Sequence, residues 1–139
     1  MKPVSSLHPA LYHASVCLRR AHRRLKWRFS GIHFAETRFP ELLPVILTSH
    51  QSLLRRKLAG TDSDLQNGKV ESLKIAVALL NGVVIRPGEQ FSFWKLLGKP
   101  SRARGFQKGL QLSFGELTSM TGGGLCQLSN LLHWMVLHT

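Results

Sequence analysis

The first apolar pattern along the chain repeats with the period of an α-helix. Its members are Leu11, Ala14, Leu18, Ala21, Leu25 and Phe29. Basic residues largely fill the other faces, namely Arg19, Arg20, Arg23, Arg24, Lys26 and Arg28. The pattern predicts a basic amphipathic helix in a segment 1–35, which we separate from a domain 36–139. We favour a helix that packs on that domain with its charged face solvated. Two alternatives remain: an in-plane anchor on anionic lipid, and nucleic-acid binding, for which no recognition motif is present.

A second helix is predicted near the middle of the chain. Val70, Leu73, Val77 and Leu80 share one face, with Ala76 beside them. The Asn-Gly pair at 81–82 is a good helix stop, so the predicted helix covers 69–81. The nine residues before it, 60–68, are rich in turn formers and predict a loop.

Short strands are predicted on both sides of this helix. The β-favourable run Val-Ile-Leu-Thr predicts a strand near 43–49. A strand over 83–85 is followed by a type II turn, in which proline presets φ and glycine accepts a positive φ. The aromatic run that comes next predicts another strand over 91–94. We expect Phe91, Phe93 and Trp94 in the core.

A hairpin and a final helix complete the predicted fold. Beyond a basic loop over 95–109, Leu110, Leu112 and Phe114 alternate with polar residues, which indicates a half-buried strand. A turn at Gly115–Glu116 and a returning strand over 117–120 follow. After a glycine-rich break, 125–137 reads as a strongly apolar helix, with Trp134 in the core. The predicted fold class is α+β: a basic N-terminal helix, a central helix, a small antiparallel sheet and a C-terminal apolar helix after a Gly-rich loop.

The net charge of the chain limits the classes of binding partner that we expect. Nineteen Lys and Arg face seven Asp and Glu, for a net charge of +12. Residues 1–35 hold seven basic residues and no acidic one. Such a surface attracts an anionic cell-wall precursor, a membrane surface or nucleic acid, of which we disfavour nucleic acid. The sequence does not decide the oligomeric state.

Cysteine content and hydropathy indicate the cellular compartment in which we expect the protein. Cys17 and Cys126 are too few for a disulfide framework, and no Cys/His zinc spacing occurs, so we predict thiols, no metal and no cofactor. No apolar run approaches the ~20 residues of a membrane span. The N-terminus also lacks the pattern of a signal peptide. We therefore expect a cytoplasmic protein, either free or peripheral at the inner membrane face.

The densest candidate chemistry lies at the start of the last helix. Gly122, Gly123 and Gly124 allow a close backbone approach or a positive φ, and Cys126 falls in the first helical turn. Free N–H groups and the positive end of the helix dipole favour a thiolate there, and could hold an oxyanion or a carboxylate. The competing interpretation of Cys126 is a small buried residue in a tight helix start.

A nucleophilic cysteine also needs a base within reach. His133 lies about 10 Å along the helix axis from Cys126, which is too far for direct pairing. His50 and His33 are candidates from other segments. The ligand-binding candidates are Gly122, Gly123, Gly124, Gln127, Ser129, Asn130 and Arg104. The loop 95–109 is either a solvated surface or part of a binding site. In the second case, we expect Arg104 to be the residue that binds an anionic group.

Three ordered motifs resemble a known family. Residues 81–94, NGVVIRPGEQFSFW, are similar to its G-x-V-[IL]-x-P-G-E-x-F-S-F/Y segment. Residues 105–109, GFQKG, are similar to its G-[YF]-x-x-G step, and 122–129, GGGLCQLS, to its G-G-G-[IL]-C-Q-x-S signature. The chain resembles the VanW family over 40–138, and 49–54, SHQSLL, is similar to the form of the member that names the family.

The resemblance implies an association with glycopeptide (vancomycin) resistance and cell-envelope or peptidoglycan metabolism. It names no reaction, so whether the chain is an enzyme is left open. In the family the last helix continues into T-P-L and E-R-x-x-H; this chain ends at His138-Thr139, so we expect a truncation before that region. Three hypotheses follow: thiol-dependent chemistry at Cys126, a non-catalytic binding module for an anionic cell-wall or lipid ligand, and an inactive truncated fragment.

Overall fold

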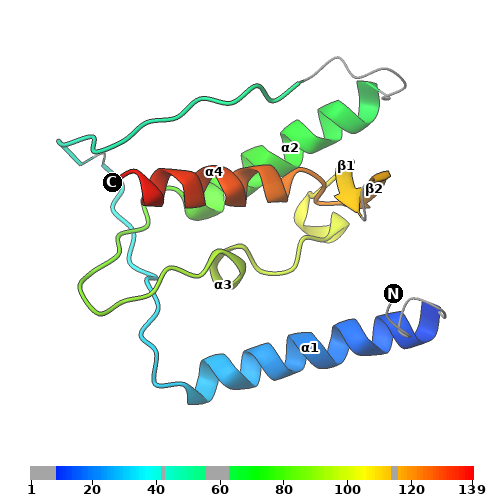
Figure 1. Ribbon diagram of the computed structural model, residues 1–139, viewed down its shortest axis with the longest axis horizontal. Coiled ribbons are helices and arrows are strands. Elements are labelled where there is room, and N and C mark those ends of the chain that lie inside the picture. Colours follow the sequence, from blue (N-terminus) through cyan, green and yellow to red (C-terminus); the bar gives the residue numbers. More distant parts are fainter. Residues whose placement is uncertain (1–8, 42, 56–62, 114–115) are drawn as a thin grey trace. The chain divides into compact units, whose positions relative to one another are not determined.

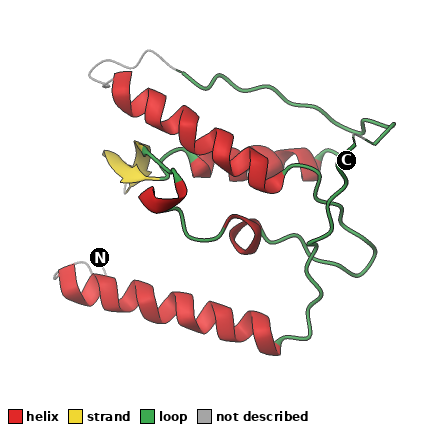
Figure 2. Ribbon diagram, turned by 180° about the vertical axis from the view of Figure 1, so that it is seen from behind, coloured by secondary structure: helices red, strands yellow, loops and turns green. Residues whose placement is uncertain are grey.

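The computed structural model describes residues 9–41, 43–55, 63–113 and 116–139 (Figure 1). The described elements are helices, one short 3-10 turn and one hairpin, which confirms the α+β class (Figure 2). Within the described residues, no helix is long and apolar enough to cross a bilayer. Contacts divide the chain into two units, and each is considered by itself.

The first unit comprises residues 1–34 together with 87–90. Its helix, α1 (Pro9–Phe29), has the apolar repeat that predicted it. The Trp27 ring packs edge-on against Phe34, with 6.0 Å between centroids. Phe34 forms an isolated parallel bridge with Gln90, whose N–H donates to the His33 carbonyl at 2.8 Å. The chain turns at 87–88, where Gly88 has the positive φ, 83°, that the turn prediction required.

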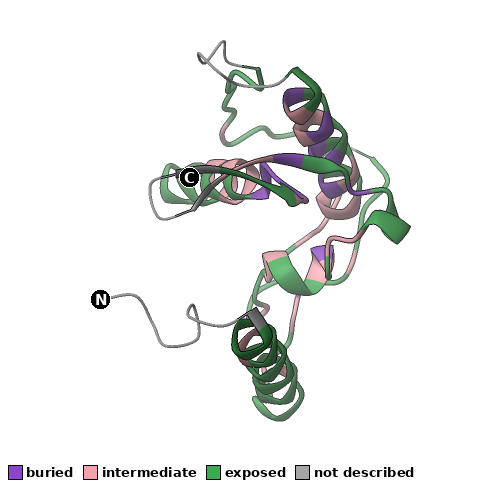
Figure 3. Ribbon diagram, turned by 90° about the vertical axis from the view of Figure 1, so that its right-hand side faces the viewer, coloured by how far each residue is buried: buried purple, intermediate pink, exposed green. Residues whose placement is uncertain are grey.

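The second unit, residues 35–86 and 91–139, holds the longer part of the chain. Its elements are α2 (Ser63–Leu80), α3 (Phe93–Leu97), the 3-10 turn η2 (Arg102–Arg104), the strands β1 (Lys108–Ser113) and β2 (Glu116–Thr121), and α4 (Leu125–Leu137). Ala76, Leu97, Phe106 and Leu125 form its buried cluster. These four residues come from α2, α3, the loop after η2 and the start of α4. Figure 3 shows the buried stretches of the chain in purple. The core therefore joins segments that are far apart in the sequence.

The hairpin is antiparallel and packs on α2. Its register pairs Lys108 with Thr121 and Ser113 with Glu116. Ser72 on α2 is fully buried, and its hydroxyl donates to the Gln107 carbonyl at 3.2 Å. The same oxygen accepts the Gln107 N–H at 3.1 Å. These two hydrogen bonds to Gln107 fix where β1 begins along α2.

Several predicted elements are observed. The helix α4 has the predicted bounds, and the hairpin strands match to within a few residues. The predicted turn at Gly115–Glu116, with Phe114 before it, lies partly outside the described residues. The helix stop at 81–82 is present, with Gly82 at φ 72°. However, α2 begins at Ser63, six residues before the predicted start, in a segment that we expected to be a loop.

Three predicted strands are wrong. Residues 43–49 have no strand assignment, because a β-favourable run still needs a partner to pair with. Residues 83–85 contribute a single antiparallel bridge, between Val83 and Arg38. The run 91–94 leads into α3, because Phe93 and Leu97 are four residues apart and pack together on the buried cluster.

The aromatic residues predicted for the core are only partly there. Phe93 packs against the buried cluster. Phe91 is 38% exposed, Trp94 45% and Trp134 40%. The aromatic side chain at the centre of the core is instead Phe106, which is fully buried.

Candidate functional site

The glycine-rich loop before α4 is tightly packed. Gly122, Gly123 and Gly124 are all buried. Gly122 and Gly124 have φ of 80° and 91°, in the left-handed region that favours glycine. A Cβ on Gly123 would collide with the carbonyl group of Gly109 on β1. A Cβ on Gly124 would collide with the Lys69 side chain on α2. The three glycines thus let the start of α4 fit against β1 and α2.

Backbone hydrogen bonds hold this loop in place. The Gly122 N–H donates to the Gln107 carbonyl at 2.9 Å, and the Gly123 N–H to the Met120 carbonyl at 3.0 Å. The helix begins after Gly124, and the first intrahelical donor is the Gln127 N–H, at 3.0 Å from the Gly124 carbonyl. The amides of Leu125 and Cys126 precede that bond, in the first turn where N–H groups have no partner within the helix.

Cys126 is an exposed free thiol in this first turn. Its exposure is a correction to the alternative interpretation, in which it was a small buried residue. Its carbonyl accepts the Ser129 hydroxyl at 3.0 Å, so Ser129 is turned toward the backbone of α4. The described part of the chain places no hydrogen-bonded histidine or carboxylate at the Cys126 thiol.

The polar candidates share one side of α4. At about 100° per residue, Cys126, Ser129, Asn130 and His133 fall within roughly a third of the helix circumference. Cys126, Asn130 and His133 are exposed, and Ser129 is half-buried. His50 is not beside Cys126: its ring lies 4.4 Å from that of Trp134, two turns further along α4. His33 belongs to the first unit.

Gln127 points to the other side of α4 and makes a tether. Its side-chain amide donates to the Ser52 hydroxyl at 3.0 Å and to the Leu53 carbonyl at 3.2 Å. These bonds hold the extended segment around 52–54 beside α4. The predicted ligand-binding role of Gln127 remains a prediction, and the contacts in the structure are with the chain itself.

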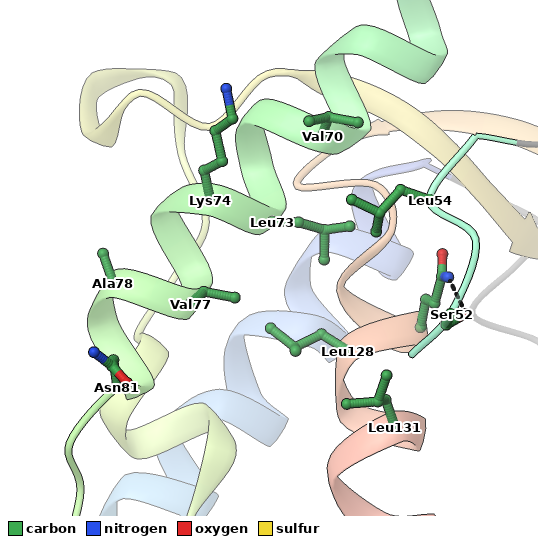
Figure 4. A pocket seen from close by; sticks show the side chains of 11 residues that line it. Ser52, Leu54, Val70, Leu73, Lys74, Val77, Ala78, Asn81, Leu128 and Leu131 are labelled. Carbon is green, nitrogen blue, oxygen red and sulfur yellow. Dashed lines mark hydrogen bonds between the residues drawn. The ribbon is translucent and has the colours of Figure 1, made fainter. Parts of the chain in front are cut away.

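An apolar groove of about 430 Å³ lies where this tethered segment meets α2 and α4. Figure 4 shows Val70, Leu73 and Val77 of α2 facing Leu128 and Leu131 of α4, with Leu54 across the opening. The sequence analysis did not identify this groove. The sequence feature that could have indicated the groove was the apolar stripe of α2. This stripe continues to Val77, which is 49% exposed in the structure.

The basic loop is organised by Arg104. Its Nη1 donates to the carbonyls of Leu97, at 2.7 Å, and Lys99, at 2.8 Å. Its guanidinium carbon lies 5.5 Å from the centre of the Phe106 ring, at the edge of the core. Its predicted role toward an anionic ligand remains a prediction. The described residues contain no group of three His, Cys, Asp or Glu side chains that could hold a metal ion.

One ion pair affects titration beside this loop. Lys95 lies 2.7 Å from the Glu36 carboxylate. The hydrogen bond from Lys95 and its positive charge hold the pKa of Glu36 below its ordinary value. Because both groups are largely exposed, the pair lies apart from the core and positions the chain locally.

Comparisons with known proteins agree with the three motifs. A family model described as "VanW like protein" matches residues 68–139. The vancomycin B-type resistance protein VanW of Enterococcus faecalis is 40% identical over 126 residues, covering 88% of this chain and 46% of that protein. The uncharacterized protein YoaR of Bacillus subtilis is 31% identical over 61 residues, covering 44% of this chain and 20% of that protein. The chain therefore spans less than half the length of either relative, and no solved structure matches it.

Proposed function

Because the chain belongs to the VanW family, we propose that it acts in glycopeptide resistance at the cell envelope through a reactive thiol, Cys126, on a cell-wall peptide or its precursor. The observation that carries the proposal is the exposed thiol in the first turn of α4. Free N–H groups and the positive end of the helix dipole lie beside this thiol, where they can stabilise negative charge that develops during the reaction.

The surroundings of Cys126 suit an acyl substrate. A carbonyl carbon attacked by the thiolate develops an oxyanion, and the amides of Leu125 and Cys126 are backbone donors in that turn. Asn130, one turn further on the same side and exposed, is available to a substrate amide. The leaving group must be protonated, and His133 is the ionisable side chain on this face of α4. At about 10 Å along the axis, however, His133 is too far from the sulfur to reach a leaving group bonded to the attacked carbon, so water supplies that proton.

A second candidate function is a binding module without turnover, and the groove favours it. Its walls are apolar, and Lys74 at its margin, which pairs with Glu71 at 2.9 Å, is 68% exposed. An apolar slot beside a lysine suits a ligand with a hydrocarbon part and an anionic group, such as a lipid. Since Leu128 and Leu131 lie on the side of α4 away from Cys126, a ligand bound there leaves the thiol free.

The chain contains its own control for the thiol. Cys17 is also exposed, but it lies in the interior of α1, where backbone N–H groups are bonded within the helix. We expect iodoacetamide to alkylate Cys126 several-fold faster than Cys17 at neutral pH, because the free N–H groups of a first helical turn lie beside Cys126 and not beside Cys17. Mass spectrometry of each site, in native and in urea-denatured protein, gives the two rates.

The outcomes separate the two functions. A native excess of Cys126 reactivity that disappears on denaturation supports the thiol proposal. Equal rates in the folded protein would remove its physical basis. Binding in the groove also predicts that Cys126→Ser keeps full affinity for a monomeric anionic lipid probe, that salt weakens this binding, and that Leu131→Gln in the groove wall abolishes it while α1 is unchanged.

A further inference from the structure

The surface of α1 combines two properties that a solvated helix does not need together. The first is uncompensated positive charge. Six basic residues lie on α1, and all are exposed: Arg19, Arg20, Arg23, Arg24, Lys26 and Arg28. None of them forms an ion pair among the described residues. Nor does the segment 1–35 contain any acidic residue in its sequence.

The second property is an exposed apolar stripe along the same helix. Leu11, Leu18 and Leu25 are spaced by seven residues and therefore lie within about 40° of one another. They are 54%, 71% and 56% exposed, and Phe29, in line with them, is 78% exposed. Four large apolar side chains in one line form a patch that water hydrates unfavourably.

The described residues of the first unit, 9–34 and 87–90, leave this stripe exposed. One contact that α1 makes there is through Trp27, whose ring meets Phe34. Val16 and Trp27, both half-buried, lie about 140° to 160° around the helix from Leu11. The packed side of α1 and the leucine stripe are thus on nearly opposite faces, and α1 can keep its contact with Phe34 while the stripe meets a partner.

The basic residues are placed for an anionic lipid surface. Lys26 and Arg28 flank the stripe on its two sides, at roughly 60° to 100° from its middle, whereas Arg20 and Arg23 lie on the far face. Long basic side chains beside an apolar stripe reach up to phosphate groups while the stripe enters the acyl boundary. Nucleic acid would use the charge but would leave the leucines and Phe29 in water.

We propose that α1 binds an anionic lipid surface in the plane of the interface, with Leu11, Leu18, Leu25 and Phe29 toward the acyl chains and Lys26 and Arg28 at the headgroups. This inference is independent of the proposed thiol chemistry, because α1 and Cys126 belong to different units.

Co-sedimentation of the full chain with vesicles tests the proposal. One set contains phosphatidylcholine alone, and the other contains phosphatidylcholine with about a third phosphatidylglycerol. We expect binding to the anionic vesicles that weakens with salt, and little binding to the neutral ones. The variant Leu18→Gln/Leu25→Gln keeps the charge and the helix propensity, and we expect its partition coefficient to fall by roughly tenfold or more.

Two double variants with the same change in net charge serve as the matched pair. Lys26→Gln/Arg28→Gln should weaken binding more than Arg20→Gln/Arg23→Gln, since only the first pair flanks the stripe. Far-UV circular dichroism confirms that the helix content of each variant is retained. Equal losses in the two pairs, or a leucine variant that binds like the wild type, would reduce the interaction to charge alone and overturn the proposal. So would binding to a single-stranded oligonucleotide that matches binding to vesicles and ignores the leucine substitutions.

Discussion

Gly123 illustrates how a single missing Cβ sets the geometry of the candidate site. It is buried, and its Cα faces the carbonyl group of Gly109 so closely that a side chain has no room. Moving α4 outward to make room would break the bonds that join 122–123 to 107 and 120. The position of Cys126, three residues later, therefore depends on the absence of a side chain at Gly123.

A pair of alanine substitutions separates this steric effect from backbone strain. Gly123→Ala must displace backbone, so we expect it to lower the free energy of unfolding by about 3 kcal/mol. Gly105→Ala meets only the tip of the Ile75 side chain, at 3.1 Å, and leaves the strain of a φ of 84°. That strain should cost about 1 kcal/mol. Urea denaturation of both variants measures the difference; a smaller loss for Gly123→Ala than for Gly105→Ala would show that the loop gives way easily.

At the scale of secondary-structure elements, α4 and the hairpin could be predicted from periodicity, because the fold places both in the way that their own residue patterns require. The early start of α2 could not be predicted in this way, because its first residues favour turns locally, namely Ser63, Asp64, Asn67 and Gly68. Tertiary packing overrides that preference: Gly68 is buried against the Lys108 carbonyl, where a Cβ would not fit. Likewise, spacing alone predicted that Cys126 and Asn130 share one face of α4, but not that this face is exposed. The groove was not predicted, because it needs the segment around 52–54, which Gln127 tethers from a distance in sequence.

One hydroxyl on α2, that of Ser72, makes two hydrogen bonds at the start of β1. Ser72→Ala removes both hydrogen bonds to Gln107, so we expect a loss of about 1 to 3 kcal/mol in the free energy of unfolding. Lys74→Ala, two residues away on the same helix, loses only the exposed pair with Glu71 and should cost no more than about 0.5 kcal/mol. Hydrogen exchange at the Gln107 amide should accelerate in the first variant alone. Unchanged protection at that amide would contradict the assignment.

Considered as a whole molecule, the described part of the chain buries few large side chains. The buried hydrophobic residues of the described part are Ala35, Leu73, Ala76, Leu97, Phe106 and Leu125. Phe106 is the largest of them, and it touches the ends of elements that are remote in sequence. Stability of the second unit is thus concentrated in a small number of contacts.

Substitutions at two phenylalanines test whether a small number of contacts supplies most of the stability of the second unit. Phe106→Ala should destabilise the second unit by about 3 to 5 kcal/mol, which is a large fraction of the stability of an ordinary domain. Phe91→Ala, at a site that is 38% exposed, should cost about 1 kcal/mol or less. Thermal unfolding followed by near-UV circular dichroism distinguishes them. Comparable losses would place Phe91 in the core after all.

The two exposed cysteines give the chain a property that neither has alone. One is on α1 and the other on α4, in different units. A molecule with one accessible thiol stops at a disulfide-linked dimer when it is oxidised, whereas a molecule with two can link to a neighbour at each and grow into an open polymer. In air, loss of material from solution would then reflect cross-linking between folded chains, reversible by a reductant, and replacement of Cys17 by serine would limit the product to dimers.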